Sequence, residues 1–340
     1  MRIGFLGAGL IATYHSKSLR RSGVEATWSG VYDPDSERAA VFAAASGAPL
    51  CETEEHVLDT CDAVYVCTWT SEHPRLVAMA AERGLPVFCE KPLATSLAGA
   101  RDMAATVAAA GITNQVGLVL RSSPVFLALR ALIEDPASGR VMSVVFRDDQ
   151  YIPVQGTYRS SWRGDVTKAG AGTLLEHSIH DVDLLEWLIA PMASVSAQSA
   201  GFHGIEGIED VAGVAIRFTN GAIGSLMSVW HDVLDRPSLR RVEVFCERAW
   251  FAVERDWLGP LTWTRADGTG GVIEGDALFA LAPSPDGAHS GQGNPDGAFV
   301  RAAAEGLPAT PDFAIAVRAH ELVDAMYRSA AAGGTQQDVT

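Results

Sequence analysis

A glycine-rich turn near the start of the chain constrains the possible folds more than any other sequence feature. Residues 2–7 form a short apolar run, and the pattern GxGxxA at 7–12 follows it directly and opens a helical stretch. The first glycine permits a tight turn, the second lets a pyrophosphate approach the backbone, and the alanine lets the helix pack closely on a sheet. This placement predicts a dinucleotide-binding loop, against the alternative of a glycine turn without a ligand. The residues expected to line the loop are Gly7, Gly9, Leu10, Ile11 and Ala12.

The chain up to residue 121 alternates short apolar runs with longer helical stretches. Apolar runs lie at 2–7, 26–32, 63–68, 86–89 and 112–120, and helical stretches lie at 10–21, 36–46, 73–83 and 96–110. Such alternation is typical of βαβ units, which place parallel strands in one sheet through right-handed connections. The sequence therefore predicts an α/β fold for residues 1–121, with a doubly wound parallel sheet of the Rossmann type.

The chain changes character after residue 121. A strong amphipathic helix is expected at 173–189, after a helix at 124–134 and a strand at 141–147. Strands then follow one another at 195–202, 209–218, 222–231, 240–246 and 249–254. Asn220-Gly221 between two of them is a hairpin signal, so the sheet should be mostly antiparallel. An α+β domain is predicted at 122–340, with a loop at 266–294, helices at 296–305 and 312–330, and a frayed end of the chain.

Composition and charge exclude several function classes. The 340 residues are 48% hydrophobic, which is enough apolar material for two globular domains. The net charge of −15 argues against a nucleic-acid surface and against binding to an anionic membrane. The five cysteines include no CxxC pair, so reduced, buried thiols are expected. No stretch has the apolar length that spans a bilayer, and the run at 3–12 lacks a cleavage site, so a cytoplasmic protein is expected.

Asp33 favours NAD as the dinucleotide. It ends the second apolar run, close to the spacing from Gly9 at which a carboxylate holds the ribose 2′-OH and disfavours a 2′-phosphate. An alternative is that Asp33 only starts a turn with Pro34. Arg38 is near enough in sequence to bind a 2′-phosphate, so NADP stays open as the second choice.

Several further motifs stand in a characteristic order. A Glu-Lys-Pro triplet at 90–92 follows the fourth apolar run, and Thr68 and His73 follow the third. Trp-Arg-Gly-Asp stands at 162–165, and a glycine-rich stretch leading into Glu-His-Ser-Ile-His-Asp stands at 169–181. This set resembles the glucose-fructose oxidoreductase, inositol dehydrogenase and rhizopine-catabolism family (Gfo/Idh/MocA). The resemblance spans the expected Rossmann domain and the first half of the second domain.

The resemblance implies a Rossmann domain followed by an α+β domain with an open antiparallel sheet. It also implies an enzyme that oxidises or reduces a hydroxyl or keto group of a sugar or an inositol, with Lys91 and His180 carrying the proton chemistry. Glu176 stands where the family more often has aspartate. Further contacts to the cofactor are implied for Thr68, Trp69, His73, Glu90, Lys91, Trp162 and Arg163. For Trp162 and Arg163, an exposed aromatic side chain with its cationic neighbour is an equal alternative.

Oxidation of a secondary alcohol by hydride transfer needs a base within hydrogen-bond reach of the hydroxyl. His180 is the natural base because imidazole titrates near neutrality, and Lys91 is suited to donate to the same oxygen. Glu176 precedes His180 by four positions, so one helix face should carry both, with Glu176 orienting His180 or binding a substrate hydroxyl. Asp183 is a second candidate support for His180. The spacing of His177 and His180 differs from that of the zinc helix HExxH, so no metal is expected.

Two other functions share these motifs. An enzyme with tightly held NAD can oxidise a sugar transiently and then cleave a glycosidic bond. A regulatory protein of this fold can bind sugar or NAD without catalysis, although such proteins tend to lose the lysine and the histidine. The expected partner is a small sugar or cyclitol, and an uncovered apolar sheet face indicates a homo-oligomer, either a dimer or a tetramer.

Overall fold

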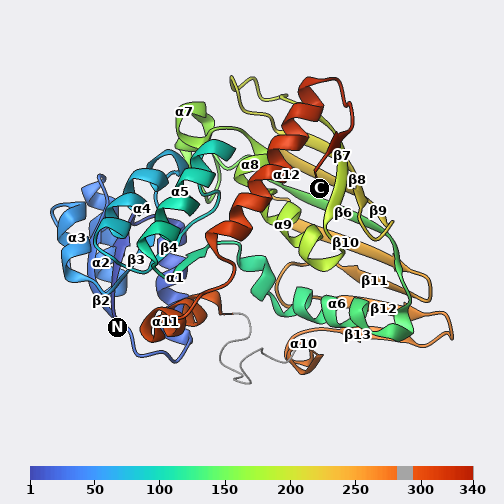
Figure 1. Cartoon of the computed structure of the whole chain (residues 1–340), viewed down its shortest axis with the longest axis horizontal. Coiled ribbons are helices and arrows are strands. Elements are labelled where there is room, and N and C mark those ends of the chain that lie inside the picture. The colour runs from blue at the N-terminus through green and yellow to red at the C-terminus, as the bar shows by residue number, and fades with distance from the viewer. Residues whose placement is uncertain (282–293, 340) are drawn as a thin grey trace. The chain divides into compact units, whose positions relative to one another are not determined.

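The computed structural model describes residues 1–281 and 294–339, and its chain forms two compact units (Figure 1). The first unit comprises Met1–Leu118 together with Asn294–Val317, and the second comprises Val119–Gly293 together with Arg318–Thr340. The first segment ends close to the boundary expected at residue 121. The division differs from the expected one at 294–317, which packs with the first unit although it follows most of the second in sequence.

The first unit is built on a five-stranded parallel sheet with the order β2-β1-β3-β4-β5. Its strands are β1 (Arg2–Leu6), β2 (Thr27–Tyr32), β3 (Ala63–Val66), β4 (Val87–Cys89) and β5 (Asn114–Val116). Helices α1 (Leu10–Arg21), α2 (Ser36–Ser46), α4 (His73–Glu82) and α5 (Leu97–Ala110) connect them as predicted, together with the additional short helix α3 (Glu54–Thr60). Buried strand side chains contribute to two separate hydrophobic clusters. The prediction of a doubly wound sheet is confirmed.

Helix α11 (Pro295–Glu305) and the start of α12 (Phe313–Ala331) complete the cores of this unit. Phe299 belongs to one hydrophobic cluster, where its ring packs edge-on against Tyr65 and Phe88. Phe313 belongs to the other cluster. The expected helices at 296–305 and 312–330 are therefore present, but a contiguous boundary at 121 misses the contribution of 294–317 to the first unit.

The second unit contains a nine-stranded sheet with the order β13-β12-β11-β10-β6-β9-β8-β7-β14. Its strands are β6 (Val141–Tyr151), β7 (Met192–Ala200), β8 (Val211–Phe218), β9 (Ile223–His231), β10 (Leu239–Cys246), β11 (Ala249–Val253), β12 (Leu261–Arg265), β13 (Gly270–Ile273) and β14 (Gln337–Asp338). All neighbouring pairs are antiparallel except β6 and β9. The prediction of a mostly antiparallel sheet is confirmed.

The expected loop and the expected frayed end both contain regular structure. β13 and helix α10 (Ala277–Leu281) lie in the stretch expected as a loop at 266–294, of which 282–293 lie outside the described residues. The expectation of a frayed end is wrong at Gln337–Asp338, because β14 pairs with β7 and Arg318 donates to the Val339 carbonyl.

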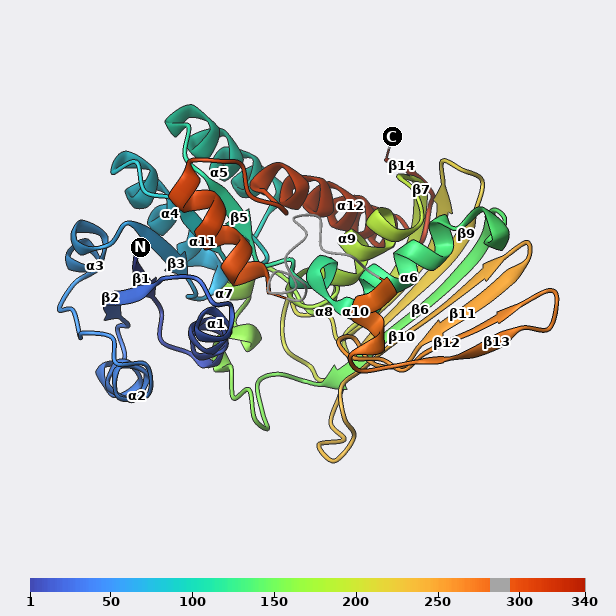
Figure 2. The ribbon, with the colours of Figure 1, turned by 90° about the horizontal axis from the view of Figure 1, so that it is seen from below.

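One face of the nine-stranded sheet packs on helices, while side chains on the opposite face are exposed. Helices α6 (Pro124–Glu134), α9 (Ile179–Leu188) and the later part of α12 share one hydrophobic cluster with the strands (Figure 2). On β6, Val144 and Phe146 are buried in this cluster, whereas Val145 between them is exposed. This period of two is that of a sheet with one covered face. Among the described residues, no helix combines the length and apolarity needed to cross a membrane.

The helix expected at 173–189 is interrupted. It forms the short α8 (Thr173–Glu176) and then α9, with His177 and Ser178 between them. The hydroxyls of Thr173 and Ser178 both hydrogen-bond to Ser228 on β9, at 2.7 and 2.6 Å. These side-chain bonds hold the interrupted turn against the sheet, which a count of helical positions does not reveal.

Candidate active site

The glycine loop has the geometry of an anion site. Gly7 has a φ of +92°, and a Cβ there would lie 2.5 Å from the carbonyl oxygen of Cys67. A Cβ on Gly9 would meet no atom within 4 Å. Gly9 precedes α1, which has no side-chain cap in the described part of the chain, so its first N–H groups are available to a phosphate. Leu10 and Ile11 are exposed there and Ala12 is fully buried, so the loop fits a pyrophosphate.

Asp33 is held at the end of β2 beside this loop. Its Oδ2 accepts the N–H of Ala8 at 2.8 Å, and its Oδ1 accepts the N–H of Asp35 at 2.9 Å. The guanidinium of Arg38 lies 3.3 Å from Oδ1, with Arg38 itself half-exposed. The carboxylate expected to select NAD is therefore fixed in the first unit next to the loop, and it neutralises the cation that would favour NADP.

The Glu-Lys-Pro triplet follows β4 at the same edge of the parallel sheet. Glu90 is buried, and its Oε2 accepts the N–H of Lys91 at 3.2 Å. The Lys91–Pro92 peptide bond is cis. His73 places one ring nitrogen 2.9 Å from the Pro92 carbonyl and the other 3.2 Å from the Thr68 carbonyl. His73 therefore ties the turn after β3 to the turn after β4.

Trp69 lies in the same turn region as these residues. It precedes a short 3₁₀ turn at Thr70–Glu72, and its carbonyl accepts the Thr68 hydroxyl at 3.4 Å. The structure thus brings together Thr68, Trp69, His73, Glu90 and Lys91, all of which the sequence predicted for one site.

In the second unit, Trp162, Arg163 and Glu176 form one contact. Nε of Arg163 donates to Oε2 of Glu176 at 3.2 Å, and the Arg163 guanidinium lies 4.3 Å from the centre of the Trp162 ring. Glu176 has an exposed fraction of 1%. A buried carboxylate requires hydrogen-bond partners, and Arg163 supplies one of them to Glu176.

His180 lies in the first turn of α9, beyond the interruption. The expectation that Glu176 and His180 share one face of a continuous helix is therefore wrong, because Glu176 ends α8 and His180 belongs to α9. Asp183, the second residue expected to support His180, pairs with Arg121 instead. It accepts two hydrogen bonds from Arg121, at 2.6 and 2.8 Å.

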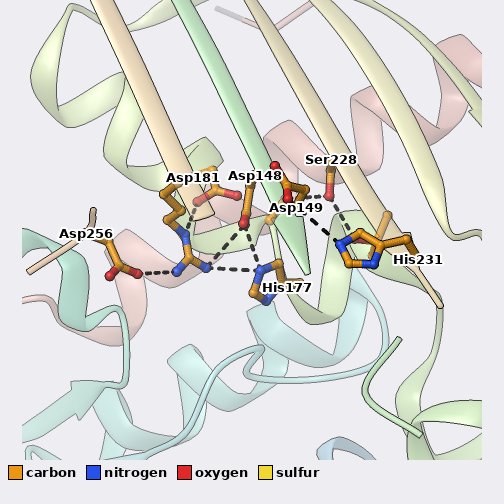
Figure 3. Close-up of polar contacts among 10 residues, drawn as sticks. Asp148, Asp149, His177, Asp181, Ser228, His231 and Asp256 are labelled. Atoms are coloured by element: carbon orange, nitrogen blue, oxygen red, sulfur yellow. Dashed lines mark hydrogen bonds and ion pairs between the residues drawn. The ribbon is translucent and has the colours of Figure 1, made fainter. Parts of the chain in front are cut away.

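A network of charges lies beside His177 in the second unit (Figure 3). Arg240 on β10 contacts three carboxylates, at 3.2 Å from Asp148, 2.8 Å from Asp181 and 2.6 Å from Asp256. Nε2 of His177 lies 2.8 Å from Oδ2 of Asp148. Burial, together with the charge of Asp148, raises the pKa of Asp181 well above its usual range. Asp181 is therefore the carboxyl of this network whose charged form is most strongly disfavoured.

A second cluster surrounds Asp149 at the end of β6. Arg236 donates to Asp149 at 2.7 Å. Nε2 of His231 lies 3.8 Å from the same carboxylate (Figure 3). Over residues 1–281 and 294–339, no group of three or more His, Cys, Asp or Glu side chains is arranged to hold a metal ion.

Similarity to known proteins decides the family. A family model described as an oxidoreductase family with an NAD-binding Rossmann fold matches residues 1–118, and a Gfo/Idh/MocA C-terminal domain model matches residues 126–252. The chain belongs to the Gfo/Idh/MocA oxidoreductase family. The resemblance stated from the motifs and the expectation of an NAD-binding protein are confirmed at the level of the family.

Two named relatives are similar to this Gfo/Idh/MocA chain over part of its length. The chain is 33% identical over 192 residues to an inositol 2-dehydrogenase of Cereibacter sphaeroides, covering 56% of this chain and 54% of the relative. It is 31% identical over 229 residues to a 1,5-anhydro-D-fructose reductase of Ensifer adhaerens, covering 65% of this chain and 67% of that protein. The match to the inositol 2-dehydrogenase thus spans about half its length.

A solved structure shares the Gfo/Idh/MocA fold throughout the chain. Levoglucosan dehydrogenase in complex with NADH and levoglucosan superposes with a TM-score of 0.88 at 22% identity, covering 100% of this chain and 99% of that one. At this identity the likeness shows the fold alone.

Sequence reasoning missed three charged residues of this Gfo/Idh/MocA chain, two of them buried and one partly buried. Asp148 lies on a strand that the pattern ended at residue 147, and Arg240, the second residue of β10, has a side chain that is only 12% exposed. His15 follows the glycine loop on α1 and is fully buried. The available signal was a charged residue at an inward position of an otherwise apolar strand or helix, which is rare unless the charge is paired.

Proposed function

We propose that this protein is an NAD-dependent oxidoreductase that transfers a hydride between nicotinamide and a secondary hydroxyl or keto group of a sugar, an inositol or a related polyol. The observation that carries the proposal is Lys91, which follows β4 at the sheet edge where the glycine loop and Asp33 also lie. The carboxyl ends of parallel strands are where such folds bind their ligands. The names of the relatives, an inositol 2-dehydrogenase and a 1,5-anhydro-D-fructose reductase, support this substrate class.

The first unit would hold the cofactor through groups already described. The N–H groups that open α1 would bind the pyrophosphate, and Asp33 would accept hydrogen bonds from the adenosine ribose. Bound NAD supplies the hydride acceptor, and NADH supplies the donor.

Lys91 and His180 would carry the proton chemistry. His180 removes the hydroxyl proton as the alcohol is oxidised and returns it in the reverse reaction. Lys91 donates a hydrogen bond from its ammonium group to the reacting oxygen and stabilises the negative charge that develops there. Glu176 binds a substrate hydroxyl, with its carboxylate held in place by the hydrogen bond from Arg163.

The test is a panel of inositols, hexoses, anhydrosugars and their keto forms, followed through the absorbance of reduced coenzyme. Lys91→Met and His180→Asn should each lower kcat by about 100-fold or more with the best substrate, as expected for loss of a general acid or base. Lys168→Met is the matched control, because Lys168 is a partly exposed lysine 3.5 Å from Asp165 and belongs to none of the predicted site residues. Turnover that survives both changes would remove this mechanism.

We also propose that the exposed face of the nine-stranded sheet associates with a second copy of the chain. Val145, Ile223 and Met227 expose 43%, 55% and 44% of their surface on adjoining strands of the sheet. Neighbouring exposed apolar side chains of this kind mark association surfaces. Met227→Lys should lower the mass measured by light scattering at a given concentration.

A further inference from the structure

His15 is a buried histidine with a carboxylate at each of its ring nitrogens. It lies in the second turn of α1, and its exposed fraction is 0%. Nε2 lies 2.7 Å from Oε1 of Glu90, and Nδ1 lies 2.6 Å from Oδ1 of Asp296. The ring also packs edge-on against Phe88, with the ring centres 4.8 Å apart. The glycine-loop helix, the end of β4 and the start of α11 therefore meet at one imidazole within the first unit.

The contacts require a charged ring. Ionised carboxylates only accept hydrogen bonds, so an imidazole that satisfies both must carry a proton on each nitrogen. Burial by itself lowers the pKa of His15, but Asp296 and Glu90 outweigh it and raise that pKa to about 10. Burial opposes the ionisation of Glu90 as well, yet His15 and then Lys91 lower the pKa of its carboxyl. The imidazolium and the Glu90 carboxylate are consequently both charged at neutral pH.

Glu90 connects this ion pair to Lys91. While Oε1 contacts His15, Oε2 accepts the N–H of Lys91 at 3.2 Å. Gly117, just beyond β5, closes the space on another side, because a Cβ there would lie 2.4 Å from Oε1. The carboxylate is therefore confined between α1, the Lys91 backbone and Gly117.

Asp296 is in turn anchored to the same unit. Asn294 donates from Nδ2 to the Ser18 carbonyl on α1 at 2.9 Å, and Gln115 donates from Nε2 to the Pro295 carbonyl at 3.1 Å. These bonds fix the start of α11 against α1 and β5. The imidazolium thus has rigid partners on both sides.

We propose that His15 is a positioning residue for Lys91, which acts by holding the Glu90 carboxylate against the Lys91 backbone. The catalytic part of this inference rests on the proposed function, in which Lys91 contacts the reacting oxygen. The placement of Lys91 by His15 is a separate statement and is testable without any substrate. The charge of His15 matters because a neutral side chain of similar size would leave the buried carboxylates of Glu90 and Asp296 without their shared cation.

The chain offers an unusually simple probe, because its only lysines are Lys17, Lys91 and Lys168. Protein grown with ¹⁵N-lysine gives three backbone amide signals, and Lys91→Arg identifies the one from Lys91. In His15→Gln, the Lys91 amide signal should shift and its hydrogen exchange should become about tenfold faster, as expected for loss of a hydrogen bond to a carboxylate. Lys168 lies in the other unit and is the internal reference.

Two more variants keep the test decisive. Gly117→Ala displaces the Glu90 carboxylate without removing any charge, and it should give the same change at the Lys91 amide. It therefore supplies the test if His15→Gln does not fold. His320→Gln is the matched control, since His320 is also buried, and burial lowers its pKa to about 4 so that it is neutral. This control should leave the Lys91 signal unchanged.

Activity separates the two proposals. With the best polyol from the panel and saturating NAD, His15→Gln should lower kcat by about 10- to 100-fold while the KM for NAD changes by less than about threefold, as expected for a displaced catalytic group. A Lys91 amide that is unaffected in both His15→Gln and Gly117→Ala overturns the inference. A shifted Lys91 amide together with full turnover in Lys91→Met leaves the positioning intact and overturns the proposed function instead.

Discussion

The N–H of Ala8 in the glycine loop donates to the Asp33 carboxylate at the end of β2, at 2.8 Å. The loop that would bind the pyrophosphate and the residue that would select the ribose are therefore one hydrogen-bonded structure. A change at Asp33 should consequently affect both coenzyme affinity and coenzyme choice.

Asp33→Ser should weaken NADH binding by about tenfold, because an acceptor with a full charge is lost. NADPH binding should strengthen relative to NADH, since Arg38 would be released from its ion pair with Asp33. Fluorescence titration of both coenzymes measures the change. Asp35→Ser is the control, as Asp35 also pairs with Arg38 but caps α2. An unchanged ratio of the two affinities in Asp33→Ser would contradict this assignment.

Arg163→Met should lower the free energy of unfolding by about 1–3 kcal/mol, because the buried carboxylate of Glu176 loses its hydrogen bond from Arg163, which itself is partly exposed. Urea unfolding at neutral pH measures this loss. The surface pair of Arg328 and Asp324 provides the comparison, and Arg328→Met should cost no more than about 0.5 kcal/mol. Equal losses in the two variants would mean that Glu176 is solvated in solution.

Asp181→Asn should remove a pH dependence of stability. Because burial and Asp148 raise the pKa of Asp181 in the folded protein, its contribution is fully present below the ordinary aspartate pKa of about 4 and declines as the pH rises toward the folded value. The decline is at most about 1.4 kcal/mol per pH unit. Urea unfolding from pH 4 to pH 8 should therefore give a flatter curve for Asp181→Asn than for the unmodified protein.

The partner residue provides the control for that experiment. Asp148→Asn removes the carboxylate that contacts both His177 and Arg240, so it should destabilise the protein across the whole pH range. A pH profile that Asp181→Asn leaves unaltered would show that Asp181 is ionised in the folded state.

A fragment of residues 1–121 should not unfold cooperatively or bind NADH. It lacks Asp296, the partner of His15, and the buried rings of Phe299 and Phe313. Residues 1–118 joined to 294–317 by a glycine-serine linker should recover both properties. Calorimetry and coenzyme titration compare the two proteins, and a stable, NADH-binding 1–121 fragment would show that the later segment is dispensable.

Sequence patterns predicted the elements whose periodicity is set by one buried face. The apolar strand ending at Leu6, the glycine loop and the hairpin at Asn220-Gly221 are local features, and each appears where it was expected. The interruption at His177–Ser178 was missed because it depends on Ser228, which is 50 residues from Ser178 along the chain. Strand β13 was missed because its short run around Gly270 resembles a loop in composition.

The site residues likewise divide into those in local motifs, which the sequence predicts, and those held by partners distant in the chain, which it does not. Gly7, Asp33 and Lys91 belong to short motifs with fixed spacing from a strand end, and such motifs are readable in sequence. The partners of His15 are not, because Glu90 and Asp296 lie 75 and 281 positions after it in the chain. Contacts at that separation leave no periodic trace in a single sequence.

The separation of His15 and Asp296 has a consequence for protein synthesis. The two residues are 281 positions apart, so translation at 5–20 residues per second delays the second by roughly 15 to 55 s after the first. During that interval the nascent nucleotide-binding unit contains His15 on α1 and Glu90, but His15 has only one of its two carboxylate partners. Ribosome-bound chains halted before residue 294 should therefore be open to proteases and chaperones in the unit that is synthesised first.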